Sequence, residues 1–138
     1  MTHTSEIQSH PAYKCGRLLA VIERIQSLAI GNPNATLTDR YYGSASTTPA
    51  SVFGVLVRMA QPHLSKLRKQ REGLAIALER ALHDAMPDYF PTTLTLTEQG
   101  LFALGYYHQR REFFTPRNTT ASAPTADEQP TLISEEAE

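Results

Sequence analysis

The 138-residue sequence has few of the features that mark secreted, disulfide-stabilised or membrane-spanning proteins. Its single cysteine, Cys15, excludes an internal disulfide and indicates a reducing compartment. No apolar run approaches the roughly 18 to 20 residues that span a bilayer. The first residues also lack the basic start and apolar core of a secretory signal. We therefore expect a soluble, cytoplasmic protein that makes no membrane contact.

Catalytic and metal-binding motifs are also scarce in the sequence. The five histidines and one cysteine include no pair with metal-ligand spacing, such as H-x-x-x-H or C-x-x-C. The sequence has no glycine-rich phosphate loop and no G-x-S-x-G nucleophile elbow. Cys15 falls on an apolar helix face, where a cysteine is more often part of the core than a nucleophile. The sequence therefore predicts no catalytic residue, no metal site, no cofactor and no enzyme activity.

Charge divides the chain into two unequal parts. Residues 115–138 contain five acids and only Arg117, a formal charge of -4, and they have no aromatic residue. Residues 1–114 then hold 12 basic and 9 acidic residues, a charge of +3, and the two parts sum to the net charge of -1. A segment with so little apolar surface cannot offset its ordering entropy. We predict one helical bundle domain over residues 1–114 and a disordered acidic tail over residues 115–138.

Helical periodicity begins near the N-terminus of the expected bundle. Pro11 suits a first helical turn, and Gly31 is a typical residue just beyond a helix end. His3 and His10 precede this helix in a start that we expect to be mobile. Apolar residues recur at spacings of three and four between Pro11 and Gly31, which predicts one buried face. Its members are Cys15, Leu18, Leu19, Ile22, Ile25 and Ala29.

The segment TDRYYGSASTTPASVF, residues 38–53, is polar and rich in turn residues. Thr36 and Asp39 have capping-box spacing, which predicts a short helical turn that Gly43 ends. We expect a polar link over residues 44–47, after which Thr48 and Pro49 begin a second long helix. The side chains of Tyr41 and Tyr42 should pack into the bundle, and Arg40 is a secondary candidate for a subunit or nucleic-acid contact.

The second half of the expected bundle contains three further helical segments. One apolar register crosses Pro62, which predicts a kinked but continuous helix, and residues 72–86 continue the helical pattern. A capping box at Thr95 and Glu98 starts the last helix, which ends near Phe114. We predict an all-α protein, a single bundle of about four to five helices. The apolar register of the helix that crosses Pro62 is Phe53, Leu56, Ala60, Leu64 and Leu67. In the last helix, one face is formed by Leu101, Leu104, Gly105 and His108, and the glycine would allow a neighbouring helix to approach closely.

Basic residues lie away from these apolar stripes and are candidates for contact with a nucleic-acid backbone. The run KLRKQR, residues 66–71, has four basic residues in six, and two arginines follow tyrosines at a spacing of four near the end of the last helix. Such faces are often only solvated surface, and such tyrosines often only pack, so both interpretations stay open. The candidate nucleic-acid-binding residues are Arg17, Arg24, Arg58, Lys66, Lys69, Arg110 and Arg111.

Three blocks of the sequence carry a family resemblance: AYKCGRLLAVIERIQ, NATLTDRYYGSASTTPASVF and FPTTLTLTEQGLFALGYYHQR. In this order they resemble the C-terminal helical region of the type I-C CRISPR large subunit, over roughly residues 11–111. That region is also made as a free small subunit from an internal translation start, and a chain beginning at Met1 is similar to that product.

The resemblance implies a non-catalytic component of the crRNA-guided Cascade complex. Its partners would be the large subunit, the backbone subunits, crRNA, target DNA and further copies of itself. It would support the R-loop and the displaced DNA strand, since sequence is read by guide pairing and protein supplies backbone contacts. The alternatives are a purely structural helical spacer that touches no DNA, or a domain excised from the larger protein.

Overall fold

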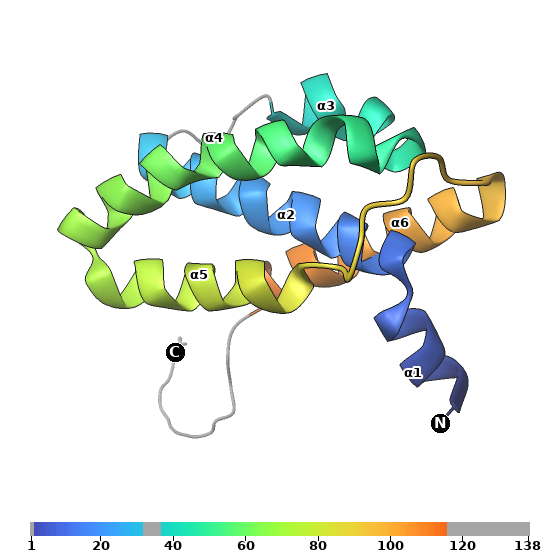
Figure 1. Ribbon diagram of the computed structural model, residues 1–138. Coiled ribbons are helices and arrows are strands. Elements are labelled where there is room, and N and C mark those ends of the chain that lie inside the picture. The colour runs from blue at the N-terminus through green and yellow to red at the C-terminus, as the bar shows by residue number, and fades with distance from the viewer. Residues whose placement is uncertain (1, 32–36, 116–138) are drawn as a thin grey trace, which may run out of the picture.

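The computed structural model describes residues 2–31 and 37–115, and within these ranges it contains helices and loops but no strand (Figure 1). The predicted all-α fold is confirmed. The described ranges hold six helices, where four or five were expected. The additional helix lies at the start around His3, which was expected to be mobile. The predicted acidic tail and the cap at Thr36 lie outside these ranges. The helices are α1 (Thr2–Ser9), α2 (Pro11–Ile30), α3 (Leu37–Thr47), α4 (Pro49–Gln70), α5 (Glu72–Ala85) and α6 (Leu96–Phe114).

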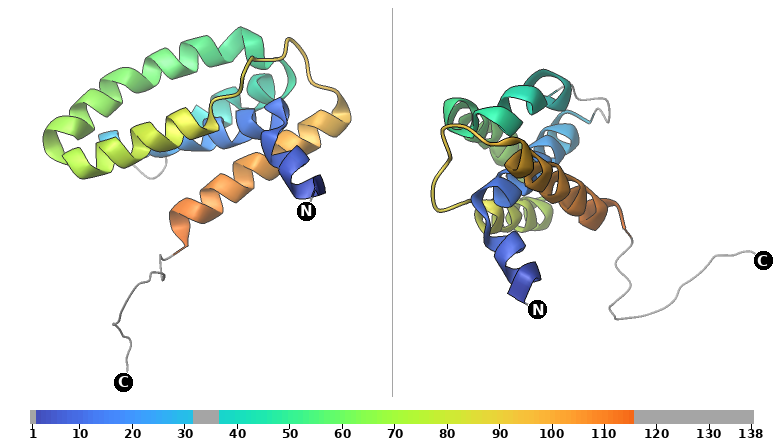
Figure 2. Two further views of the ribbon diagram at one scale, coloured as in Figure 1. Left: turned by 60° about the horizontal axis from the view of Figure 1, so that its bottom comes forward. Right: turned by 90° about the vertical axis from the view of Figure 1, so that its right-hand side faces the viewer.

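Helix α2 is the central element of the bundle. Pro11 is its first residue, and Gly31 ends it in the left-handed region at a φ of 67°, as the sequence predicts. His10 also belongs to this helix start, because its Nδ1 accepts a hydrogen bond of 3.0 Å from the backbone N–H of Ala12. All six predicted face residues are buried, and so are Tyr13, Ala20 and Val21 on other sides. The helix is therefore enclosed by its neighbours (Figure 2).

Two glycines set the crossing of α2 and α6. A Cβ atom on Gly105 would lie 2.0 Å from the carbonyl oxygen of Tyr13, and one on Gly16 would lie 1.9 Å from that of Phe102. The predicted close approach at Gly105 is confirmed, whereas the role of Gly16 was not foreseen. Without side chains at these positions, the two backbones touch directly.

The buried face of α6 differs from the predicted one. Leu104 is exposed, and Leu101 and His108 are only partly buried. The prediction is wrong at Leu104. It holds for Gly105 and in part for Leu101, which packs against the core from a partly buried position, and the His108 ring bonds the Tyr13 hydroxyl. The backbone contact at Gly105 turns the aromatic side of α6 toward α2. The buried residues of α6 are Phe102, Gly105, Tyr106 and Gln109.

Helix α3 is longer than the sequence predicts. It continues through Gly43 to Thr47, so the expected polar link is its last turn. Serine and threonine hydroxyls in this turn donate to carbonyls one turn earlier: those of Ser46 and Thr47 lie 3.0 and 2.8 Å from the carbonyl oxygen of Gly43. Thr48 precedes α4 as predicted, but its hydroxyl donates to the carbonyl of Ser44 at 3.1 Å and does not cap α4.

Helices α4 and α5 form an antiparallel hairpin that turns at Arg71 (Figure 1). Helix α4 is continuous across Pro62, as predicted, and every residue of its predicted apolar register is buried. The capping box at the start of α6 is also confirmed. The Thr95 N–H donates to Glu98 Oε1 at 2.8 Å, and the Glu98 N–H donates to Thr95 Oγ1 at 3.2 Å.

The loop between α5 and α6 is tied to the junction of α3 and α4. The backbone N–H of Leu94 donates to the Thr47 carbonyl at 2.9 Å, and that of Ala50 donates to the Pro91 carbonyl at 3.0 Å. Phe90 in this loop stacks on Phe53 of α4 with ring centroids 5.2 Å apart. As for membrane association, none of the helices in the described ranges combines the length and apolar character that crossing a bilayer requires.

Candidate nucleic-acid interface

The outer side of α4 carries three of the predicted basic residues, Arg58, Lys66 and Lys69. All three are exposed, while the register that starts at Phe53 faces the core. At 1.5 Å per residue, Arg58 and Lys66 are about 12 Å apart along the helix axis. We call these three residues the α4 basic surface.

Helix α4 contains no aspartate or glutamate along its whole length. Its fourth basic residue, Arg68, forms an ion pair with Glu79 of α5 across the hairpin. The α4 basic surface has no such acidic partner within the part of the chain that the structure describes. Exposed cations without a neighbouring carboxylate remain free to bind phosphate groups.

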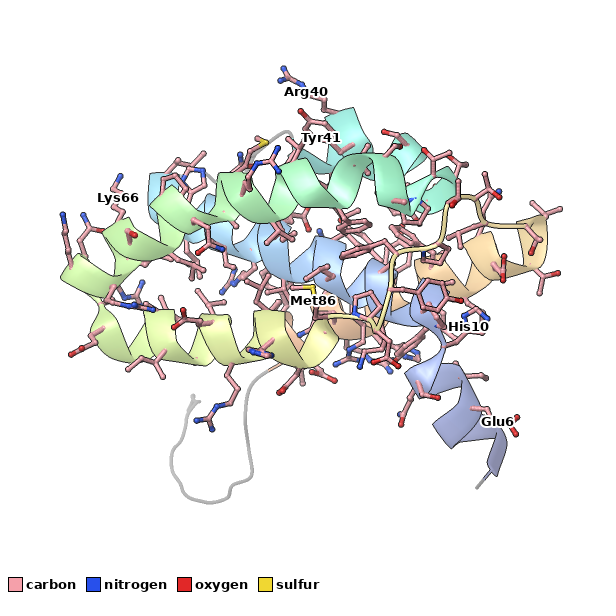
Figure 3. All side chains as sticks on the ribbon, in the orientation of Figure 1. Glu6, His10, Arg40, Tyr41, Lys66 and Met86 are labelled. Carbon is pink, nitrogen blue, oxygen red and sulfur yellow. The ribbon has the colours of Figure 1, made fainter. Side chains whose placement is uncertain are left out.

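Helix α3 adds one more cation on the same side of the molecule. Arg40 is exposed, and Figure 3 shows Arg40 and Lys66 projecting from the same edge, from α3 and α4 respectively. The tyrosines that follow Arg40 have the predicted packing role. Tyr42 meets the rings of Phe102 and Tyr106 edge to face at centroid distances of 5.4 and 5.3 Å.

Arg17 has a different environment from the α4 basic surface, because internal partners hold it. Its guanidinium lies 2.7 Å from Glu112 Oε2 and 3.0 Å from the Tyr13 hydroxyl, which also bonds His108 Nδ1 at 2.8 Å. Burial lowers the pKa of Arg17, but the hydrogen bonds with Glu112 and Tyr13 outweigh this effect and raise it overall. This arginine joins α2 to α6.

Arg110 belongs to a second cluster between α2, α3 and α6. Its Nη1 lies 3.0 Å from Glu23 Oε1 and 3.2 Å from the Tyr106 hydroxyl. The Tyr106 hydroxyl also donates to the Glu23 carboxylate, which accepts a further hydrogen bond from Thr38. Burial lowers the pKa of Arg110, and the bond with Tyr106 and the charge of Glu23 more than compensate. Four polar groups thus satisfy one another at this seam.

Arg24 and Arg111 have no carboxylate partner among the described residues. Arg24 stacks on Phe114, with its guanidinium carbon 4.7 Å from the ring centroid, and Arg111 is exposed on α6. Burial, and secondarily the positive charge of Arg71, lower the pKa of Arg24. Arg71 belongs to the basic run between α4 and α5 and approaches Arg24 only in the folded chain, so helical spacing alone does not reveal this interaction.

The seven predicted residues therefore do not form one surface. They come from three helices, α2, α4 and α6, and α2 packs against both α4 and α6 (Figure 2). Two of the seven, Arg17 and Arg110, have structural partners. Phosphate binding by protein side chains requires exposed cations that are not already neutralised, and the α4 basic surface meets this requirement best.

The described residues offer no group that could act as a metal centre. Within the ranges 2–31 and 37–115, no three His, Cys, Asp or Glu side chains lie close enough together to hold an ion. Cys15 is fully buried in the core, as predicted, and burial raises the pKa of its thiol to about 12. A thiol in this state is a poor nucleophile.

The described residues thus form an all-helical module in which the residues of the α4 basic surface have no carboxylate partner, whereas Arg17 and Arg110 are paired within the fold. Residues 3–114 match the family described as CRISPR-associated protein (Cas_Csd1). The match spans most of the chain, and the chain belongs to this family of type I-C CRISPR-associated subunits. A search of curated proteins found no match.

Proposed function

We propose that this chain is a non-catalytic subunit of a type I-C RNA-guided DNA surveillance complex. In that role it holds a nucleic-acid backbone and so stabilises the R-loop and the displaced strand. The observation that carries the proposal is the α4 basic surface: Arg58, Lys66 and Lys69 are exposed on a helix that has no acidic residue. Family membership supplies the CRISPR context.

The chemistry of this surface suits contact that does not depend on base sequence. Lysine and arginine bind phosphates and release condensed counterions, whatever the bases are. In guide-directed systems, base pairing reads the sequence, and strand exchange is nearly balanced in free energy. A few phosphate contacts on the displaced strand are therefore enough to favour the open R-loop.

A second candidate function is that of a structural spacer between other subunits. The apolar side chains of Leu104, Tyr107 and Phe114 are exposed on α6, and such residues often contact other proteins. The two functions make different demands on the molecule: the first uses cations on α4, and the second uses apolar residues on α6.

Charge reversal on α4 tests the first function in the assembled complex. Arg58→Glu, Lys66→Glu and Lys69→Glu together should weaken target-DNA binding and flatten its dependence on salt. Losing three phosphate contacts lowers the slope of log K against log salt by about 2 to 3, at roughly 0.7 to 0.9 per contact. Filter binding at several salt concentrations measures both quantities, and circular dichroism melts check that the fold persists.

Matched single variants separate a local contact from general electrostatics. Lys66→Glu and Arg80→Glu change the net charge equally, but Arg80 lies on α5 near Glu79 and Asp84. Only the change on α4 should weaken binding substantially. By contrast, Leu64→Ala should cost about 2 to 5 kcal/mol of fold stability, because Leu64 is buried. An assembled triple variant with unchanged affinity and slope would refute DNA binding by α4 and favour the spacer.

A further inference from the structure

The outer face of α6 carries four exposed apolar side chains, and exposed Arg111 lies in the same sector. Leu96 is 84% exposed, Leu104 39%, Tyr107 62% and Phe114 59%. At 100° per residue these four side chains fall within one sector of the helix, opposite the buried ring of Phe102. A helix with apolar residues on both faces normally has a second contact. We call these four exposed residues the α6 apolar stripe.

Arginines border the C-terminal end of the α6 apolar stripe. Two guanidiniums lie near the Phe114 ring, that of Arg24 at 4.7 Å and that of Arg110 at 5.4 Å from the ring centroid. Arg111 is exposed on the same helix. The nearby carboxylate of Glu23 is already paired with Arg110, and Asp39 lines an open pocket together with Tyr107. The surface as a whole combines apolar rings with uncompensated positive charge.

We propose that the acidic segment of residues 116–138 binds back onto the α6 apolar stripe and its arginine border. This segment follows directly after α6, so it starts at the end of the surface where the arginines gather. It contains Arg117 and five acids, and its apolar pair, Leu132 and Ile133, precedes the acidic sequence SEEAE. Its composition is therefore complementary to the surface in both charge and polarity.

The length of the segment is sufficient for this contact. Leu104 precedes Phe114 by ten residues, which is about 15 Å along the helix at 1.5 Å per residue. From Thr115 to Leu132, 17 residues can extend to roughly 55 Å at about 3.3 Å per residue. A tether of this length also gives the segment an effective concentration on the order of millimolar at the stripe, so a weak contact is substantially occupied.

This contact would bury apolar side chains of α6 that are exposed among the described residues. It covers the α6 apolar stripe and places carboxylates beside Arg24 and Arg111. The segment lies beyond residues 3–114, which match the family. Any effect of this contact on nucleic-acid binding by Arg24 and Arg111 rests on the proposed function. The contact between the segment and α6 does not.

Paramagnetic relaxation enhancement tests the contact in the full chain without nucleic acid. A nitroxide placed at Ser134→Cys reports the neighbourhood of Leu132 and Ile133. Cys15 should not be labelled, because it is fully buried and its pKa is raised to about 12. We expect the amide signals of Tyr107 and Arg111 to lose at least about half their intensity, while Arg58 and Lys66 on α4 are unaffected. At 1 M salt, where the Debye length is about 3 Å, the effect should weaken.

Variants on both sides of the contact complete the test. Neutralising the five acids to Asn and Gln should reduce the signal loss at least two-fold, and so should Arg111→Glu. Lys66→Glu makes the same charge change on α4 and should leave the signal loss unchanged. Signal loss confined to Thr115 would overturn the proposal. Signal loss that appears when labelled and isotope-enriched chains are mixed would also overturn it, because the occupant would then be a second copy. DNA binding affects neither result.

Discussion

Gly105→Ala tests the direct backbone contact between α2 and α6. The added Cβ would lie 2.0 Å from the carbonyl oxygen of Tyr13 and 3.2 Å from the backbone nitrogen of Arg17. Backbone atoms cannot rotate away as a side chain can, so the two helices must separate. Overpacking of this kind costs about 1 to 3 kcal/mol, occasionally more. The intrinsic preference of alanine for helices returns roughly 1 kcal/mol. Because the clash is with backbone, we expect an overpacking cost near the upper end of this range. After the gain in helix propensity is subtracted, the net loss of stability is about 2 kcal/mol.

Gly100→Ala is the matched control on the same helix. Apart from the adjacent residues and the backbone of α6 itself, no heavy atom lies within 4 Å of a Cβ built there, so this change should stabilise the protein by about 0.5 to 1 kcal/mol. For a domain of this size, 1 kcal/mol shifts the melting temperature by roughly 3 to 6 °C. Circular dichroism melts should therefore place Gly105→Ala about 6 to 12 °C below the parent and Gly100→Ala slightly above it. Equal melting temperatures for the two variants would refute the backbone contact.

Two further outcomes follow from local contacts. Thr95→Ala should lower the free energy of unfolding, measured by chemical denaturation, by about 1 kcal/mol, because it removes one half of the capping box. Thr48→Ala should lower it less, because Thr48 does not cap α4. Equal losses for the two variants would contradict this. Cys15 should resist alkylation at pH 8 unless denaturant is added, since its pKa of about 12 leaves almost no thiolate. Above pH 9 the unfolded thiol ionises and the buried one does not, so the free energy of unfolding should fall with pH, and a rise would contradict the assignment.

Sequence signals located most helix boundaries because those signals are local. Pro11, Gly31 and the pair Thr95 and Glu98 act through backbone groups within four residues, and each has the predicted role. Gly43 was misread because glycine is only mildly unfavourable inside a helix. Side chains of the following residues bond its carbonyl, and α3 continues past it.

The candidate site was less predictable than the helices. The exposure of Arg58, Lys66 and Lys69 followed from the apolar register of α4, because residues off that register point away from the core. The partners of Arg17 and Arg110 could not be foreseen in the same way. Helical spacing suggested that Arg110 stacks on Tyr106, and its guanidinium carbon does lie 5.6 Å from the ring centroid. Spacing along one helix gave no sign of the Glu23 carboxylate that binds Arg110.

The sequence by itself determined that this protein is helical, which sides of α2 and α4 are apolar and where α6 begins, because these depend on neighbours one helical turn apart. Only the tertiary structure decided which charges remain free. Glu112 pairs with Arg17 across 95 residues, and Glu23 pairs with Arg110 across 87. These pairs exist because Gly16 and Gly105 bring the backbones of α2 and α6 into contact. Such a crossing depends on the fit of two surfaces and not on the composition of either helix alone.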